Sequence, residues 1–357
     1  MLVVSAVLLA AAACQGGRLS EMGTAGSSGH LSGAGGGIGI LGAGGAAGGP
    51  NCGEVDVATA MVQTDIIILL DRSASMNDDT ANTPCDGGCG ATSKWAQAAA
   101  AIDRIVGDTE DRVNWGLKWF PDSDNACGVF SLPTVGVAPF NHDVIVSELA
   151  LHTTSNGGLA SGGNTPTRAA VAAAHDYLGG VADANRKLIL LVTDGAPDCR
   201  QGASDVTADD STATDQAVNE AQLFGYPTIV VGIGTSGGPA DATLNELAQT
   251  GYQASPDGPP FYYPVTDAGD MTTTLQGLVK SAADCVFALP PPPNENLDVA
   301  DIEVKVDDAY VSHDYDHVSG WDYTDNSQTA IQIYGAVCDA FMSGQAKNVS
   351  IAFLCII

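Results

Sequence analysis

The feature that most constrains the fold is a series of almost unbroken apolar runs rich in β-branched residues. Such runs are typical of strands that are buried on both faces of a sheet. They cover Ile66–Leu70, Leu188–Val192 and Thr228–Ile233. Helical spacing, caps and terminating glycines predict helices over 94–106, 166–178, 215–224, 241–249 and 267–283. We therefore predict an α/β fold, with a doubly wound, mostly parallel sheet that carries helices on both faces.

Three weaker segments belong to the same domain. Residues 115–120 and 261–265 are expected to be strands, and residues 144–149 form either a weak strand or the start of a helix. In open sheets of this kind, ligands bind outside the carboxyl ends of the strands. The search for function therefore concentrates on the residues that follow the strands.

A small β-rich unit is predicted at the C-terminus, beyond the stiff run of prolines at 290–293. Ile302, Val304 and Val306 alternate with polar residues, and segments 330–334 and 348–353 also have the character of strands. Within this unit, Gly320–Trp321 and Asp314–Asp316 are interpreted as turn and loop elements.

The N-terminus has the pattern of an export signal. Leu2–Ala13 is apolar but too short to span a bilayer, and small residues directly precede Cys14. This resembles a bacterial lipobox, which implies cleavage before Cys14 and lipidation of that cysteine. The alternative is an ordinary secretory signal with an incidental cysteine. The Gly-, Ala- and Ser-rich stretch that follows lacks large side chains and is predicted to be a flexible tether.

Four regions follow from these observations. They are the signal peptide (1–13), the lipidated cysteine with its tether (14–60), the main domain (61–285) and the proline-rich break with the β-rich unit (286–357). The expected location is the bacterial cell envelope or outer surface. The formal net charge of −29 argues against nucleic acid and anionic membrane surfaces as partners, so membrane contact is expected only through a lipid anchor.

Eight cysteines follow Cys14, and an even number in an exported chain predicts disulfides. The segment Cys85–Cys89 is expected to be a surface loop stapled by a disulfide, with Cys127 as another bonding partner for its cysteines. A metal cluster there would need a second pair of matching spacing, which the chain lacks. Cys199 is expected to brace the rim of the site described next. Bridges from Cys285, Cys338 and Cys355 are expected to anchor the C-terminal unit.

Oxygen-bearing side chains follow the strands. The first buried strand runs into Asp71, Ser73 and Ser75, which form the pattern D-x-S-x-S. A loop containing Thr165 directly precedes a helix, and Asp194 follows the strand 188–192. Carboxylates and hydroxyls are hard donors, which suit Mg²⁺, Mn²⁺ or Ca²⁺ rather than zinc. Alone, Asp71 and Ser73 could merely cap a turn, but the three blocks together indicate a metal site.

These three blocks, in this order and strand context, resemble a von Willebrand factor A domain with a metal-ion-dependent adhesion site. The resemblance implies that Ser73 and Ser75 bind the metal directly, and that Thr165 does so too, with Thr167 as the second choice. It implies that Asp71 and Asp194 hold the metal directly or through water. It also implies one open coordination position for an acidic group of the partner, and a last helix, 267–283, that shifts in some members.

The sequence therefore predicts a binding module without enzymatic activity that captures a carboxylate of a protein or glycan ligand through a divalent metal, most simply Mg²⁺. One alternative is an envelope scaffold whose metal site is structural or vestigial. A second is a serine hydrolase, because Ser236 lies in a G-x-S-x-G pattern with His313 and His317 downstream. The helix after Ser236 is, however, not expected to start before Asp241, which argues against a nucleophile elbow.

Overall fold

The computed structural model describes residues 55–355 except 60, 123–125, 152–162, 184, 257, 290, 292–296, 325–327 and 343–344. The expected signal peptide, Cys14 and most of the expected tether lie outside the described residues. Among the described residues, no helix combines the length and the apolar character needed to cross a membrane.

A six-stranded sheet with the order β4-β3-β2-β5-β6-β7 forms the centre of the main domain. All neighbours in it are parallel except β4, which pairs antiparallel with β3. Every residue of β2 and β3 is buried. Burial on both faces explains the unbroken apolar run of β2, whereas β3 also buries the polar side chains of Asn114 and Lys118. The strands are β2 (Thr64–Asp71), β3 (Val113–Phe120), β4 (Val135–Ala138), β5 (Arg186–Thr193), β6 (Thr228–Ile233) and β7 (Tyr263–Val265).

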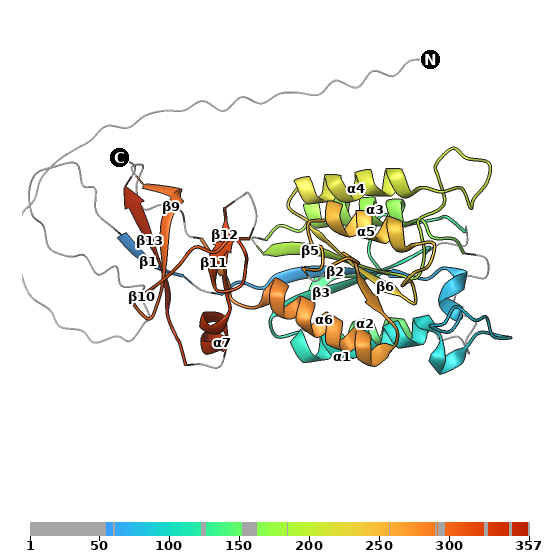
Figure 1. The fold of residues 1–357 in the computed structure, drawn as a ribbon, viewed down its shortest axis with the longest axis horizontal. Coiled ribbons are helices and arrows are strands. Elements are labelled where there is room, and N and C mark those ends of the chain that lie inside the picture. Colours follow the sequence, from blue (N-terminus) through green and yellow to red (C-terminus); the bar gives the residue numbers. More distant parts are fainter. Residues whose placement is uncertain are drawn as a thin grey trace, which may run out of the picture. The chain divides into compact units, whose positions relative to one another are not determined.

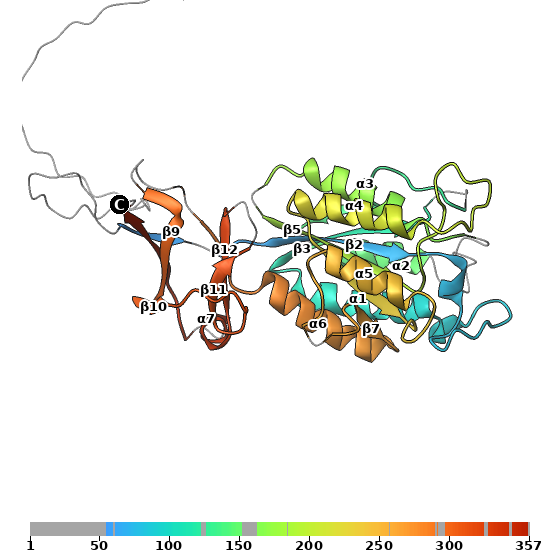
Figure 2. The same ribbon diagram turned by 45° about the horizontal axis from the view of Figure 1, so that its top comes forward.

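Helices cover both faces of this sheet, as the sequence predicts (Figure 1). One face carries α1 (Lys94–Thr109), α2 (His142–Leu151) and α6 (Ala268–Ala283), whose apolar side chains share a core with alternate strand residues. The other face carries α3 (Thr167–Gly179), α4 (Ser211–Leu223) and α5 (Asp241–Thr250). Figure 2 shows α3 and α4 on one side of the strands and α1 and α6 on the other in a turned view. Of the two alternatives for 144–149, the helix is correct.

The C-terminal unit has a core of its own and two antiparallel sheets, with the orders β1-β13-β9-β10 and β11-β12-β8. Its elements are β8 (Val286–Ala288), β9 (Leu297–Val306), β10 (Ala309–Val311), β11 (Gly320–Tyr323), β12 (Ala330–Tyr334), α7 (Ala336–Met342) and β13 (Val349–Cys355). Gly320–Trp321 therefore begins a strand, and its interpretation as a turn is wrong. Trp321 pairs with Ile333 and is buried, so the core recruits a segment that its local composition does not mark.

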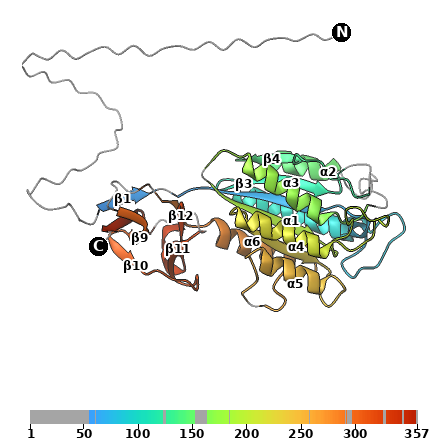
Figure 3. The same cartoon turned by 90° about the horizontal axis from the view of Figure 1, so that it is seen from above.

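The first described strand also differs from expectation. β1 (Val55–Thr59), which the sequence places in the tether, pairs antiparallel with β13, so the two ends of the described chain lie side by side (Figure 3). The first three residues of this segment, Val55, Asp56 and Val57, alternate between apolar and polar. An alternating segment can add to an open sheet edge, and here β13 provides that edge.

Three disulfides stabilise the described residues: Cys85–Cys89, Cys127–Cys199 and Cys285–Cys338. The stapled 85–89 loop is confirmed, whereas Cys127 bonds to Cys199 and not to that loop. The Cys285–Cys338 bridge joins the end of α6 to α7, within the C-terminal unit's core. The side chains of Cys52 and Cys355 lie outside the described residues.

Candidate metal centre

The candidate centre lies at the carboxyl edge of the central sheet, where β2 and β5 end side by side. These strands are parallel neighbours, with Leu70 opposite Val192. The next residues are therefore Asp71 on one strand and Thr193 on the other, and Asp194 follows. The topology alone thus brings together two of the sequence blocks, which lie more than a hundred residues apart.

Asp71 is held from both sides. One of its carboxylate oxygens, Oδ1, accepts a hydrogen bond of 2.7 Å from the backbone N–H of Ser73. The other, Oδ2, accepts one of 2.6 Å from the Thr193 hydroxyl. The residue is fully buried. Its carboxylate therefore has one fixed orientation before any ligand arrives.

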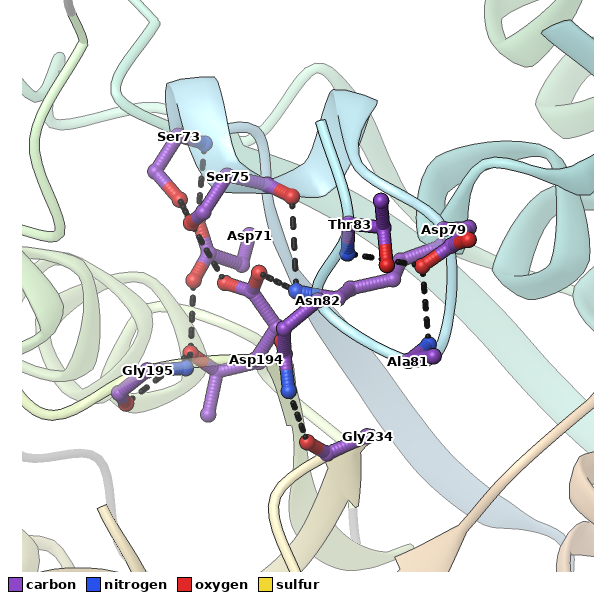
Figure 4. A network of polar contacts seen from close by, with 12 residues as sticks. Asp71, Ser73, Ser75, Asp79, Ala81, Asn82, Thr83, Asp194, Gly195 and Gly234 are labelled. Atoms are coloured by element: carbon purple, nitrogen blue, oxygen red, sulfur yellow. Dashed lines mark hydrogen bonds and ion pairs between the residues drawn. The ribbon is translucent and has the colours of Figure 1, made fainter. Parts of the chain in front are cut away.

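The two serine hydroxyls meet above this carboxylate. A short 3₁₀ helix over Ala74–Asn77 begins directly after Ser73 and turns the chain. As a result, the Oγ atoms of Ser73 and Ser75 lie 3.1 Å apart. The Ser75 hydroxyl donates to Asp194 Oδ1 over 2.9 Å. Figure 4 shows these side chains pointing toward one another.

The loop before α3 contributes the threonine. The backbone N–H of Ala74 donates to the carbonyl of Gly163 over 3.0 Å, which joins this loop to the serine loop. A Cβ added to Gly195 would lie 3.8 Å from Thr165 Oγ1, so this hydroxyl lies beside the residue that follows Asp194. Thr167 Oγ1 contacts the backbone carbonyl of Thr165 instead. Of the two candidate threonines, Thr165 therefore has the hydroxyl that lies next to Gly195, the residue after Asp194.

Two further residues belong to the centre and were missed at the sequence level. Asp198 accepts a 2.6 Å hydrogen bond from the backbone N–H of Thr165 and so fixes that loop. Lys94, the first residue of α1, forms a 2.7 Å ion pair with Asp194 Oδ2. The two side chains are 1% and 0% exposed. A lysine at the start of a helix gives no sequence signal of burial, whereas Asp198 could have been found as a further acid after β5.

The electrostatics of the centre favour a cation. Burial, reinforced by the nearby charge of Asp194, raises the pKa of the Asp71 carboxyl to about 7. The hydrogen bonds from Thr193 and Ser73 act in the opposite direction. Two buried carboxylates that repel each other are stabilised by a positive ion between or beside them.

The donor set fits a hard divalent cation. Across the described part of the chain, no cluster of three or more His, Cys, Asp or Glu side chains could hold a metal ion. A metal at this centre would therefore depend on the hydroxyls of Ser73, Ser75 and Thr165 as well as on the two carboxylates. Oxygen donors of this kind suit Mg²⁺, Mn²⁺ or Ca²⁺.

Neighbouring polar residues have other roles. Arg72 donates to the carbonyl of Pro121 over 3.1 Å and its guanidinium lies 5.6 Å from the Trp119 ring centroid. Asp79 accepts hydrogen bonds from the backbone N–H groups of Ala81 and Thr83. These contacts order the loops around the centre and add no ligand to it.

The described hydrogen bonds do not connect Ser236 with the histidines that a serine hydrolase would need. Ser236 is exposed, and α5 begins at Asp241, so no helix starts at the serine. His313 and His317 both bond to the carboxylate of Asp322 in the C-terminal unit, at 2.7 and 2.9 Å. Among the described contacts, none joins either histidine to Ser236.

Comparison with known proteins agrees with the fold. Residues 65–277 match the family model of the von Willebrand factor type A domain. No curated protein matches the chain significantly. Similar solved structures include the manganese-loaded TRAP protein of Plasmodium vivax, with 17% identity, a TM-score of 0.41, and coverage of 64% of this chain and 78% of that one.

Two bacterial pilus proteins are also similar. The minor pilin PilB of Streptococcus sanguinis has 15% identity, a TM-score of 0.45, and coverage of 62% of this chain and 61% of that one. The pilus adhesin SpaC of Lactobacillus rhamnosus GG has 14% identity, a TM-score of 0.42, and coverage of 82% and 38%. This chain thus spans less than two thirds of either pilus protein. The family model, in contrast, covers more than half of this chain. The chain belongs to the von Willebrand factor type A domain family.

Proposed function

We propose that this protein is an exported surface protein that binds a divalent cation at the candidate centre and uses it to capture an acidic group of a protein or glycan ligand. The cation is Mg²⁺ in the first instance, with Mn²⁺ or Ca²⁺ as alternatives. Ser73, Ser75 and Thr165 would hold it through hydroxyl oxygens. Asp71 and Asp194 would hold it directly or through water.

The observation that carries this proposal is that the Ser75 hydroxyl lies within hydrogen-bond distance of both the Ser73 hydroxyl and Asp194, in the loop that follows the buried Asp71. A bound cation would supply an electrophilic position for a carboxylate of the ligand. Hydroxyl ligands leave more positive charge on the ion than a set of carboxylates would, so attraction for an acidic partner remains.

The surrounding residues would preorganise the centre. Thr193 and the backbone N–H of Ser73 fix both oxygens of Asp71, so ligand capture requires no reorientation of this carboxylate. Asp198 does the same for the backbone of Thr165. A site whose groups are already ordered loses less entropy when it binds.

A metal titration of the full chain tests the proposal. Calorimetry with Mg²⁺ and Mn²⁺ is expected to show one site per chain. The Ser73→Ala variant should lose this binding while its circular dichroism spectrum and melting temperature change little. Equal binding by the wild type and Ser73→Ala would contradict the assignment of the centre.

The surface location is a separate proposal. Three disulfides support an oxidising compartment, and Cys14 would carry the lipid anchor. Metabolic labelling with a fatty acid is expected to mark the wild type and to leave a Cys14→Ser variant unlabelled. Label on Cys14→Ser would contradict this anchor.

One observation favours the scaffold alternative. The ion pair of Lys94 with Asp194 supplies a positive charge to the centre without any metal. If the protein were a scaffold with a vestigial site, its set of bound partners would be the same with and without a chelator. The adhesion proposal predicts that a chelator releases the partners.

A further inference from the structure

Lys94 is a feature of the centre that a site for divalent cations does not require. It begins α1, where its backbone N–H donates to the carbonyl of Asp78 over 2.9 Å. The preceding Ser93 caps the helix by accepting from the N–H of Ala96. The position of Lys94 is therefore fixed by secondary structure, and its side chain extends from there to Asp194.

Burial keeps this ion pair in place. Lys94 Nζ lies 2.7 Å from Asp194 Oδ2 and 3.4 Å from the backbone carbonyl of Ser75, and both charged side chains are almost completely inaccessible to solvent. A buried lysine in contact with a buried carboxylate is expensive to separate, because either partner would be left as an unpaired charge.

The loop between the 3₁₀ turn and α1 closes over the lysine. Gly234 has a φ of +64°, and a Cβ added to it would lie 2.5 Å from the carbonyl oxygen of Thr80 and 3.6 Å from Cε of Lys94. Asn82 donates to the carbonyl of Gly234 over 2.8 Å, a contact visible in Figure 4. The stem of Lys94 is thus buried, with its Cε close to the backbone at Gly234.

The two oxygens of Asp194 consequently have different partners. Oδ2 faces the lysine, and Oδ1 faces the hydroxyl of Ser75. With its partner in place, Asp194 offers only one oxygen toward the serines. Bidentate ligation by this carboxylate would require the ion pair to break.

The ammonium group of Lys94 changes the formal charge of the centre at each step of ligand capture. With Asp71 and Asp194 ionised, the centre with Lys94 carries a charge of −1, and a divalent cation makes it +1. A carboxylate of the ligand then brings it to zero. Without the lysine, the cation alone would neutralise the centre, and a carboxylate would add an uncompensated charge in a place of low dielectric constant.

We propose that Lys94 is a positioning and tuning residue that weakens the binding of the divalent cation and thereby preserves positive charge for the acidic ligand. This inference rests on the proposed function and adds to it a residue outside the ligand set. It makes the centre dependent on two cations with separate roles: a fixed ammonium group and an exchangeable metal.

The full chain carries a matched control for this inference. Lys118 also forms a 2.7 Å ion pair, with Asp122, and these side chains are 1% and 6% exposed. Its ammonium group also donates to the carbonyls of Phe130 and Leu132. Lys118→Met therefore removes a buried lysine of the same kind from another pair.

Calorimetric titration with Mn²⁺ alone tests the proposal on wild type, Lys94→Met and Lys118→Met. We expect Lys94→Met to bind Mn²⁺ at least tenfold more tightly than the wild type, and Lys118→Met to match the wild type. Acetate then serves as a probe of the Mn²⁺-loaded centre. Its binding is monitored through the effect of the bound Mn²⁺ on the relaxation of water protons. Its affinity should fall at least threefold in Lys94→Met.

The outcomes separate the inference from the proposed function. Equal or weaker Mn²⁺ binding by Lys94→Met, when the wild type binds Mn²⁺, would overturn the role of Lys94 alone. Binding by Lys94→Met but not by the wild type would support that role and contradict metal-dependent capture by the wild type. If neither the wild type nor Lys94→Met bound Mn²⁺, the role of Lys94 and the proposed function would both be overturned. Should Lys94→Met fail to fold, Lys94→Gln provides the same comparison with a polar side chain.

Discussion

Strand β2 carries a buried aspartate at each end, and the two differ in what surrounds them. Asp65 and Asp71 are both 0% exposed, and burial is the main cause of the raised pKa of each carboxyl. Asp65 Oδ1 accepts from the side-chain amides of Asn114 and Asn185, at 2.8 and 2.9 Å. Its other oxygen, Oδ2, is buried and has no hydrogen-bond partner in the described structure.

At the opposite end of the strand, both oxygens of Asp71 have partners, and a second buried carboxylate, Asp194, lies close enough to raise its pKa further. The serine hydroxyls next to it can turn their lone pairs toward a cation. The amide N–H groups around Asp65 are donors and cannot. Burial and a raised pKa therefore do not by themselves indicate a metal site; converging oxygen acceptors do.

The largest expected effect comes from neutralising each aspartate in turn. Asp71→Asn should weaken Mn²⁺ binding at least about a hundredfold, because it removes one of the two negative charges at the centre. Asp65→Asn should leave the affinity within about twofold of the wild type. Calorimetric titration of both variants measures the difference, and similar losses in the two would show that the ends of β2 are not functionally distinct.

A smaller effect is expected at the threonines. Thr165→Ala should weaken Mn²⁺ binding about tenfold, since it removes a neutral hydroxyl ligand. Thr167→Ala should change it less than twofold, because Thr167 Oγ1 contacts a backbone carbonyl. The same titration decides between them, and a reversed order would assign the ligand to Thr167.

Two of the disulfides provide a further comparison, because one lies near the candidate centre and the other lies in the C-terminal unit. Cys127–Cys199 joins the segments to which Asn164 is hydrogen bonded, through the carbonyls of Ala126 and Val206. Replacing both cysteines of this bridge by serine should weaken Mn²⁺ binding about threefold to fivefold. Replacing Cys285 and Cys338 should not change it.

Each bridge closes a loop of more than fifty residues, so either double replacement should lower the free energy of unfolding by about 4 kcal/mol. Urea denaturation measures this loss and shows whether the variants still fold. If both double variants bound Mn²⁺ as the wild type does, the Cys127–Cys199 bridge would be a general staple without a connection to Thr165.

The smallest effect concerns pH. The pKa of Asp71 is about 7 in the folded chain and 3.8 ordinarily, so between these values the folded state binds more protons than the unfolded state. The free energy of unfolding of the metal-free protein should therefore fall as the pH rises from about 4 to about 7. Urea denaturation in the presence of a chelator measures this slope.

Asp65 contributes to the slope in the same direction, because burial also raises its pKa. We expect Asp71→Asn to remove more of the pH dependence than Asp65→Asn does. A slope that Asp71→Asn leaves unchanged would mean that Asp71 is already ionised near pH 4 in the folded chain.

Local pattern was sufficient to predict five of the six strands of the central sheet, but not the short edge strand β4. The strand 228–233 has the predicted bounds, and the helix starting at Lys94 extends only three residues beyond the predicted end. Continuous apolar runs and helix-terminating glycines are local signals, so they can be recognised without knowledge of tertiary contacts. The candidate ligands could be named because three short blocks each follow a strand or precede a helix, and the parallel topology brings the blocks at the ends of β2 and β5 together.

Features that depend on tertiary partners could not be predicted in this way. β1 becomes a strand because β13 offers it an edge, and Trp321 joins a strand because a core lies beneath it. The ion pair of Lys94 joins residues a hundred positions apart. No local pattern distinguishes it from an exposed lysine at the start of a helix.

The central claim is that a divalent cation binds among Asp71, Ser73, Ser75, Thr165 and Asp194. Anomalous diffraction from crystals of the protein grown with Mn²⁺ tests it most directly. The account predicts one anomalous peak within about 2.3 Å of the hydroxyl oxygens of Ser73 and Ser75. A fully occupied peak elsewhere, for example beside Asp65, or no peak at this centre at saturating Mn²⁺, would contradict it.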